Sequence, residues 1–87
     1  MTGRSKTTAS EVHGLLLEAR PEADNVNLAK ASHLAETAGV PGDHHQLETF
    51  VAIRNLRTAI EGDASADELE SMLLHAISTA EHWVTAS

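Results

Sequence analysis

Apolar residues recur along this chain with the spacing of α-helices, most regularly between Ser65 and Val84. Eight apolar side chains in that stretch fall three or four residues apart, and they are Leu69, Met72, Leu73, Ala76, Ile77, Ala80, Trp83 and Val84. At 100° per residue they lie within a wedge of about 120°, which is the apolar stripe of a helix that faces a core. Ser65 and Glu68 have the spacing of a capping box, in which each side chain accepts a hydrogen bond from the other residue's backbone N–H. The pattern predicts a helix over about residues 66–85.

Three further helices are predicted upstream, over about residues 9–19, 24–38 and 44–61. Thr8 and Glu11 repeat the capping-box spacing before the first of them. Pro21 ends that helix, because the residue before a proline is pushed out of the α region. Gly39 after the second helix is typical of a left-handed C-terminal cap, and Gly62 lies just beyond the end of the third.

The short breaks between these segments favour antiparallel neighbours, so the predicted fold class is all-α, a compact bundle of four helices. Residues 1–7 show no periodicity and are predicted to form a flexible tail, which leaves 8–87 as a single helical domain. Gly14 lies inside the first helix, where glycine costs about 1 kcal/mol relative to alanine. We interpret it as a point of close contact with another helix.

The predicted third helix is apolar on two sides. One side carries Phe50, Ile53, Leu56 and Ile60 together with Ala52. Leu47 and Val51 lie about 120° or more from the middle of that group. A helix of this kind is either central in its bundle or part of an oligomer interface, and we expect the central position. In the alternative, the contact surface consists of Leu47, Val51, Arg54 and Asn55, extended by Leu17.

Charge adds a constraint on partners. Thirteen acidic residues face six basic ones, for a formal net charge of −7 with histidine neutral. Such a field repels phosphate backbones and anionic membranes and attracts basic partners. Five acids lie close together around the junction of the last two helices, and they are Glu61, Asp63, Asp67, Glu68 and Glu70. If they form one continuous patch, the protein can be interpreted as an acidic mimic of nucleic acid that inhibits a DNA- or RNA-binding protein.

The composition predicts a cytoplasmic protein with no membrane contact. Cysteine is absent, which fits a reducing compartment. No apolar run approaches the roughly 18 residues of a membrane span, and the first residues lack a hydrophobic signal segment. The alanine-rich, lysine-poor composition is typical of small proteins from a GC-rich bacterium or its phage.

No constellation of catalytic residues occurs in the sequence. It has no Cys or Tyr, no glycine-rich phosphate loop, no G-x-S-x-G and no H-E-x-x-H, so we predict a non-enzyme without a cofactor. Six histidines invite a test for metal ligation, and His33 with Glu36 and His45 with Glu48 are one turn apart. Both pairs run opposite to the Glu-x-x-His of di-iron helical proteins, so we interpret them as solvated surface and predict no metal site.

The segment Leu34-Ala35-Glu36-Thr37-Ala38-Gly39-Val40 resembles the first half of a bacterial helix-turn-helix, in which a small residue packs beneath the turn and a glycine makes it. The resemblance implies a DNA-binding protein whose recognition helix carries His44, His45, Glu48 and Thr49. The chain departs from the family's pattern at His45 and Glu48, where the motif has apolar residues. The implied recognition helix also has no Arg or Lys before Arg54 to hold phosphates. Direct DNA binding is therefore the second alternative.

Four short helices and an acidic surface are also similar to acyl carrier proteins. That family needs a serine at the start of its second helix, in a Gly-x-Asp-Ser-Leu context, and residues 42–47 read Gly-Asp-His-His-Gln-Leu. The residue that the chemistry requires is absent, so this resemblance is discarded. The leading hypothesis is a non-enzymatic protein–protein interaction module, an adaptor or inhibitor, whose partner presents a basic or apolar surface and which can form homo-oligomers.

Overall fold

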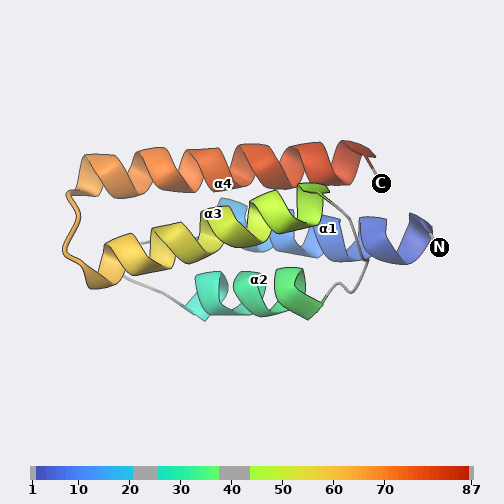
Figure 1. Ribbon diagram of the computed structural model, residues 1–87, viewed down its shortest axis with the longest axis horizontal. Helices are drawn as coiled ribbons and strands as arrows, with labels where there is room; N and C mark the ends of the chain where they lie inside the picture. The colour runs from blue at the N-terminus through green and yellow to red at the C-terminus, as the bar shows by residue number, and fades with distance from the viewer. Residues whose placement is uncertain (1, 21–25, 38–43, 87) are drawn as a thin grey trace.

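The computed structural model describes residues 2–20, 26–37 and 44–86, with side chains described from residue 8 onward in the first segment. Its helices are α1 (Thr2–Glu18), α2 (Val26–Thr37), α3 (His44–Glu61) and α4 (Ala66–Ala86). Each helix runs opposite to the one before it (Figure 1), and the packed pairs are α1–α2, α2–α3, α3–α4 and α1–α4. The four helices therefore form a closed ring around one core, which confirms the predicted all-α antiparallel bundle.

The bundle is elongated along the helix axes, measuring 39 × 20 × 19 Å with a radius of gyration of 12.1 Å. That radius matches the value of about 12 Å expected for a compact chain of this length. At 12 residues, α2 is the shortest helix, and at 21 residues α4 is the longest. Because α4 runs along most of the bundle (Figure 1) and is its longest helix, its apolar stripe is the longest wall of the core.

The predicted helix over residues 66–85 is confirmed in detail. All eight members of its apolar stripe are buried or half-buried, and Trp83 has no exposed surface. At its start, the Oγ of Ser65 accepts a hydrogen bond from the backbone N–H of Glu68 at 3.2 Å. This bond satisfies one of the N–H groups that have no partner within the helix, so the cap begins α4 where the sequence predicts.

The core is built from one to three large side chains of each helix. Those without exposed surface are Val12, Leu16, Leu28, Ile53, Leu56, Thr49 and Trp83. Burying an apolar side chain of this size stabilises the fold by roughly 1.5–3 kcal/mol. Thr49 is the polar member of the group, and its hydroxyl donates a hydrogen bond to the carbonyl of His45 at 2.9 Å.

Two expectations about α1 were wrong. The helix begins at Thr2 and not near residue 9, so Thr8 and Glu11 lie inside the helix instead of capping its start. A capping box stabilises helix formation only where N–H groups are free, and no proline among residues 2–18 forces a start at Thr8. Gly14 makes no close helix contact either, because a Cβ built on it meets no atom within 4 Å. The predicted cap at Gly39 lies outside the described residues.

The turn from α3 to α4 places a residue other than glycine in the left-handed conformation. The N–H of Ala64 donates to the carbonyl of Ala59 at 3.1 Å, and the N–H of Asp63 donates to the carbonyl of Ile60 at 3.4 Å. This pair of bonds is the Schellman motif, which needs one residue in the left-handed conformation. That residue is Asp63, with φ of 59°, and not the glycine at position 62.

Candidate functional site

The second apolar side of α3 is exposed to solvent. Leu47 retains 57% and Val51 retains 41% of its accessible surface, so the expected central position of this helix was wrong. In a ring of four, each helix has neighbours on only two adjacent sides. Leu47 and Val51 lie outside the arc that α2 and α4 cover, and they remain available to a partner.

These two residues form one wall of a groove between α3 and α4. The groove has a volume of about 500 Å³ and is lined by Leu47, Glu48, Val51, Ala52 and Asn55 of α3 and by His75 and Thr79 of α4. Leu47, Val51 and Asn55 are four residues apart, so they form a continuous ridge on α3, and His75 and Thr79 do the same on α4. We call this the α3–α4 groove.

Small buried residues at the floor explain why the groove is hollow. Ala52 and Thr79 are both more than nine-tenths buried, and the Thr79 hydroxyl donates to the carbonyl of Ala76 at 2.7 Å. The floor therefore offers a short side chain and a hydroxyl that is already bonded within its own helix. Leu47 and Val51 supply apolar walls, and the exposed Asn55, Glu48 and His75 supply polar groups at the edges. Such a groove accommodates an apolar ridge with polar flanks.

Three of the five residues predicted to bind a partner come together here. Leu47, Val51 and Asn55 line the α3–α4 groove, whereas Arg54 is exposed on α3 outside it. Leu17 is 60% exposed but belongs to α1, which packs against α2 and α4 in the ring and not beside the groove. Sequence reasoning missed His75 and Thr79, whose four-residue spacing at the border of the α4 stripe was the available signal.

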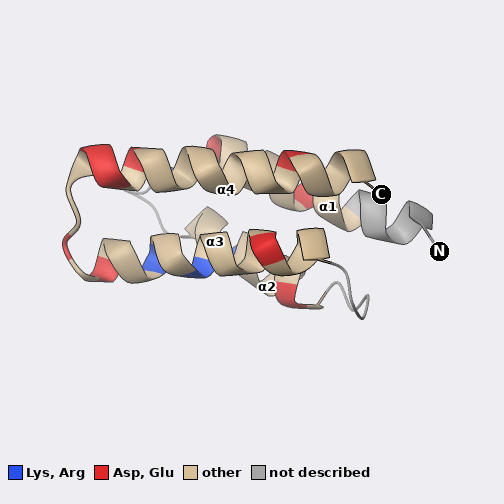
Figure 2. Cartoon of the chain, turned by 45° about the horizontal axis from the view of Figure 1, so that its top comes forward, with Lys and Arg blue, Asp and Glu red and all other residues tan. Residues whose placement is uncertain are grey.

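The five acids predicted to form a patch are all exposed and lie at one end of the bundle. Figure 2 shows this end, where α3 stops and α4 starts, with acidic positions on the last turn of α3, in the turn itself and on the first turns of α4. The remaining described acids are Glu11, Glu18, Glu36, Glu48 and Glu81, spread over all four helices. Negative charge is therefore concentrated at the α3–α4 end, without being confined to it.

Two of the sequence patterns do not assemble into sites among the residues the structure describes. Within those ranges, no three His, Asp or Glu side chains lie close enough to hold one metal ion. Thr49, which the helix-turn-helix resemblance places on a DNA-facing surface, has no exposed area and lies in the core. The turn of that motif, residues 38–43, lies outside the described segments.

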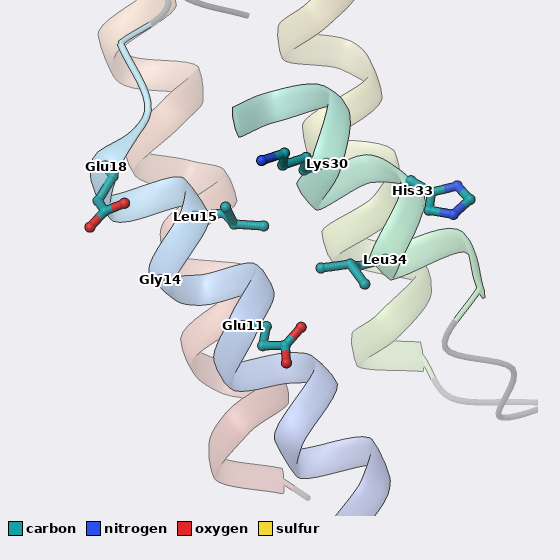
Figure 3. Close-up of a pocket in the computed structure, with 7 residues that line it drawn as sticks. All are labelled: Glu11, Gly14, Leu15, Glu18, Lys30, His33 and Leu34. Carbon is teal, nitrogen blue, oxygen red and sulfur yellow. The ribbon is translucent and has the colours of Figure 1, made fainter. Parts of the chain in front are cut away.

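A second groove lies between α1 and α2, on the side of the ring opposite the α3–α4 groove. Its volume is about 580 Å³, and its lining is shown in Figure 3: Glu11, Gly14, Leu15, Glu18, Lys30, His33 and Leu34. We call it the α1–α2 groove. Within the described part of the chain, these two grooves are separate and lie on opposite sides of the ring.

Comparisons of the chain with protein families, with curated proteins and with solved structures give no match in any of the three. Across the described residues, no helix combines the length and the apolar character that crossing a membrane requires. What distinguishes the site is its geometry, an exposed apolar ridge beside a hollow between two packed helices.

Proposed function

We propose that the protein is a non-enzymatic interaction module whose α3–α4 groove binds an amphipathic helix of another protein. The observation that supports this proposal is the exposed pair Leu47 and Val51 beside a hollow floor. In helix-in-groove recognition the bound helix places apolar anchors three and four residues apart into the groove, and here the ridge from Leu47 to Asn55 forms a wall beside which such anchors can lie. Eight residues of α-helix extend about 12 Å, which corresponds to roughly two turns of a partner helix.

Charge restricts the partner further. The net charge of −7 and the exposed Glu48 at the edge of the groove favour a partner helix with lysine or arginine flanking its apolar face. Complementary charge at the rim acts mainly on the association rate, whereas the apolar anchors determine how long the complex lasts. An adaptor or an inhibitor of a basic protein fits this combination.

The test compares capture of host proteins by three forms of the full chain: wild type, Leu47→Ala with Val51→Ala, and Leu74→Ala. Covering the remaining surface of Leu47 and Val51 contributes about 2 kcal/mol, or roughly 30-fold in dissociation constant. The double variant should lose a protein that wild type and Leu74→Ala retain. Leu74 is the matched control because it is 59% exposed on α4 but does not line the groove. Equal retention of every captured protein by all three forms would rule out the groove.

The cluster of acids at the α3–α4 end supports a second candidate, an acidic mimic that occupies a nucleic-acid-binding surface. Here the captured protein would be one that binds DNA or RNA, and added polyanion would release it. The triple substitution Glu61→Gln, Asp67→Asn and Glu70→Gln should abolish that capture, because each removed charge weakens an electrostatic contact. If the Leu47 and Val51 substitutions abolish capture of the protein and the three charge substitutions leave that capture unchanged, the mimic hypothesis is rejected.

A further inference from the structure

The α1–α2 groove has an apolar floor with charges of opposite sign on its two helices. Figure 3 shows Leu15 of α1 and Leu34 of α2 pointing towards each other across it. Both side chains are half-buried, so each still exposes apolar surface in the groove. Val26 lies one turn before Lys30 on α2 and is 58% exposed, which extends the apolar surface along that helix.

Gly14 makes this face unusually accessible. Glycine in a helix interior is costly, and here no neighbouring atom lies within 4 Å of where a Cβ would be. The packing of the single chain therefore gives no reason for the missing side chain. Small residues permit close approach of helices, and at Gly14 the space for such an approach is open on the outside of the bundle.

The charged side chains on the two walls of the α1–α2 groove indicate which partner fits it. The α1 side carries the carboxylates Glu11 and Glu18, and the α2 side carries Lys30, with His33 beyond it at the outer edge. In Figure 3, Lys30 lies level with Glu18 along the bundle. A partner that fits must place a cation above α1 and an anion above α2, and the same face of a second copy does so when rotated about an axis parallel to the helices.

We propose that a second copy of the chain docks on the α1–α2 groove to form a twofold dimer. With the twofold axis parallel to the bundle, α1 of each copy lies antiparallel against α2 of the other. Glu18 of one copy then faces Lys30 of its partner, and the relation occurs twice, as in any isologous interface. A twofold axis in the interface plane but perpendicular to the helices would instead place α1 of one copy against α1 of the other. The carboxylates Glu11 and Glu18 of one copy would then face the carboxylates of its partner. Charge therefore selects one arrangement, while Leu15, Leu34 and Val26 supply the apolar contact.

The dimer leaves both α3–α4 grooves free, because they lie on the opposite side of the ring. If those grooves bind a partner as proposed above, the dimer is a bivalent adaptor, and a partner with two binding helices is held more tightly than by one site. The dimer itself does not depend on that function. Leu47→Ala with Val51→Ala should leave dimerisation unchanged. Either proposal, partner binding in the α3–α4 groove or dimerisation through the α1–α2 groove, can therefore be refuted without the other.

The decisive experiment uses Glu18→Lys and Lys30→Glu, each as the full chain, in sedimentation equilibrium. Each variant alone places two repulsive pairs in the interface, and its dimer dissociation constant should rise about tenfold or more, since every substitution acts twice. Mixed in equal amounts, the two variants can form a heterodimer in which both pairs are again attractive. The mixture should therefore recover the dimer. A contact within one chain cannot produce this recovery, because neither chain of the mixture regains its own pair.

A second variant tests the groove by shape. Gly14→Gln places a long uncharged side chain in the α1–α2 groove, where the single chain has space for it. The dimer should be lost while helicity measured by circular dichroism is retained. Ser71→Gln is the matched control, because Ser71 is exposed on α4, a helix that does not line the α1–α2 groove. A wild-type chain that stays monomeric at its highest soluble concentration, a dimer unaffected by Gly14→Gln, or a variant mixture that stays monomeric would each overturn the proposal.

Discussion

The turn between α3 and α4 allows a sharp stability test, because its sequence and its structure predict opposite results. A glycine just past a helix normally occupies the left-handed position, and replacing it with alanine then costs about 1 kcal/mol. Here the left-handed residue is Asp63, and Gly62 is outside that region. A Cβ on Gly62 would lie 3.4 Å from the carbonyl oxygen of Thr58, which is ordinary van der Waals contact.

Two substitutions follow from this geometry. Gly62→Ala should stabilise the protein by about 0.5 kcal/mol, because it reduces the conformational entropy of the unfolded chain at no steric cost. Asp63→Gly relieves the strain of a non-glycine residue in the left-handed conformation, which is about 1–2 kcal/mol. Glycine also raises the conformational entropy of the unfolded chain, which costs up to about 1 kcal/mol of stability, so the expected net gain is about 0.5–1 kcal/mol. In a domain of this size, 1 kcal/mol shifts Tm by about 4–8 °C, so gains of roughly 2–8 °C should be visible in thermal unfolding followed by circular dichroism.

Asp63→Asn is the control for charge, because asparagine tolerates the left-handed region as aspartate does but removes one member of the acidic cluster. If Asp63→Asn raises Tm as much as Asp63→Gly does, repulsion within the cluster and not backbone conformation explains the gain. A fall of several degrees for Gly62→Ala would refute the assignment of the left-handed position to Asp63.

Three further predictions concern single positions. Ser65→Ala should cost about 1 kcal/mol of unfolding free energy through loss of the α4 cap, whereas Ser71→Ala, at an exposed position within the same helix, should gain a few tenths; equal effects would argue against the cap. Leu56→Ala should cost about 2–5 kcal/mol in urea unfolding because the side chain is fully buried, and a comparable loss for the exposed Leu74→Ala would contradict the described packing. Gly14→Ala should raise the unfolding free energy of the monomer, measured at a concentration below dimer formation, by about 1 kcal/mol, since helix propensity improves and nothing within the single chain opposes the added methyl group; a destabilised monomer would show that a helix of the same chain is packed against this position.

Local sequence was sufficient for the existence of the helices. The three- and four-residue spacing of apolar side chains placed α4 and its buried stripe correctly, and the Ser65 cap was predictable because both partners of that hydrogen bond lie within one turn. Helix starts were harder to predict. A pattern such as Thr8 with Glu11 has the spacing of a cap whether or not the helix begins there, and α1 continues back to Thr2.

Tertiary structure decided which apolar residues are covered and where the molecule is hollow. The spacing of Leu47 and Val51 shows that they share a side of α3, but their exposure depends on where α2 and α4 pack in a ring that leaves the outer arc of each helix open. The same holds for the α1–α2 groove, whose lining residues come from two helices and whose open glycine appears in sequence only as a weak helix former. Periodicity along one helix is a local property, whereas a groove is produced by the relative positions of two helices, and those positions depend on packing across the whole core.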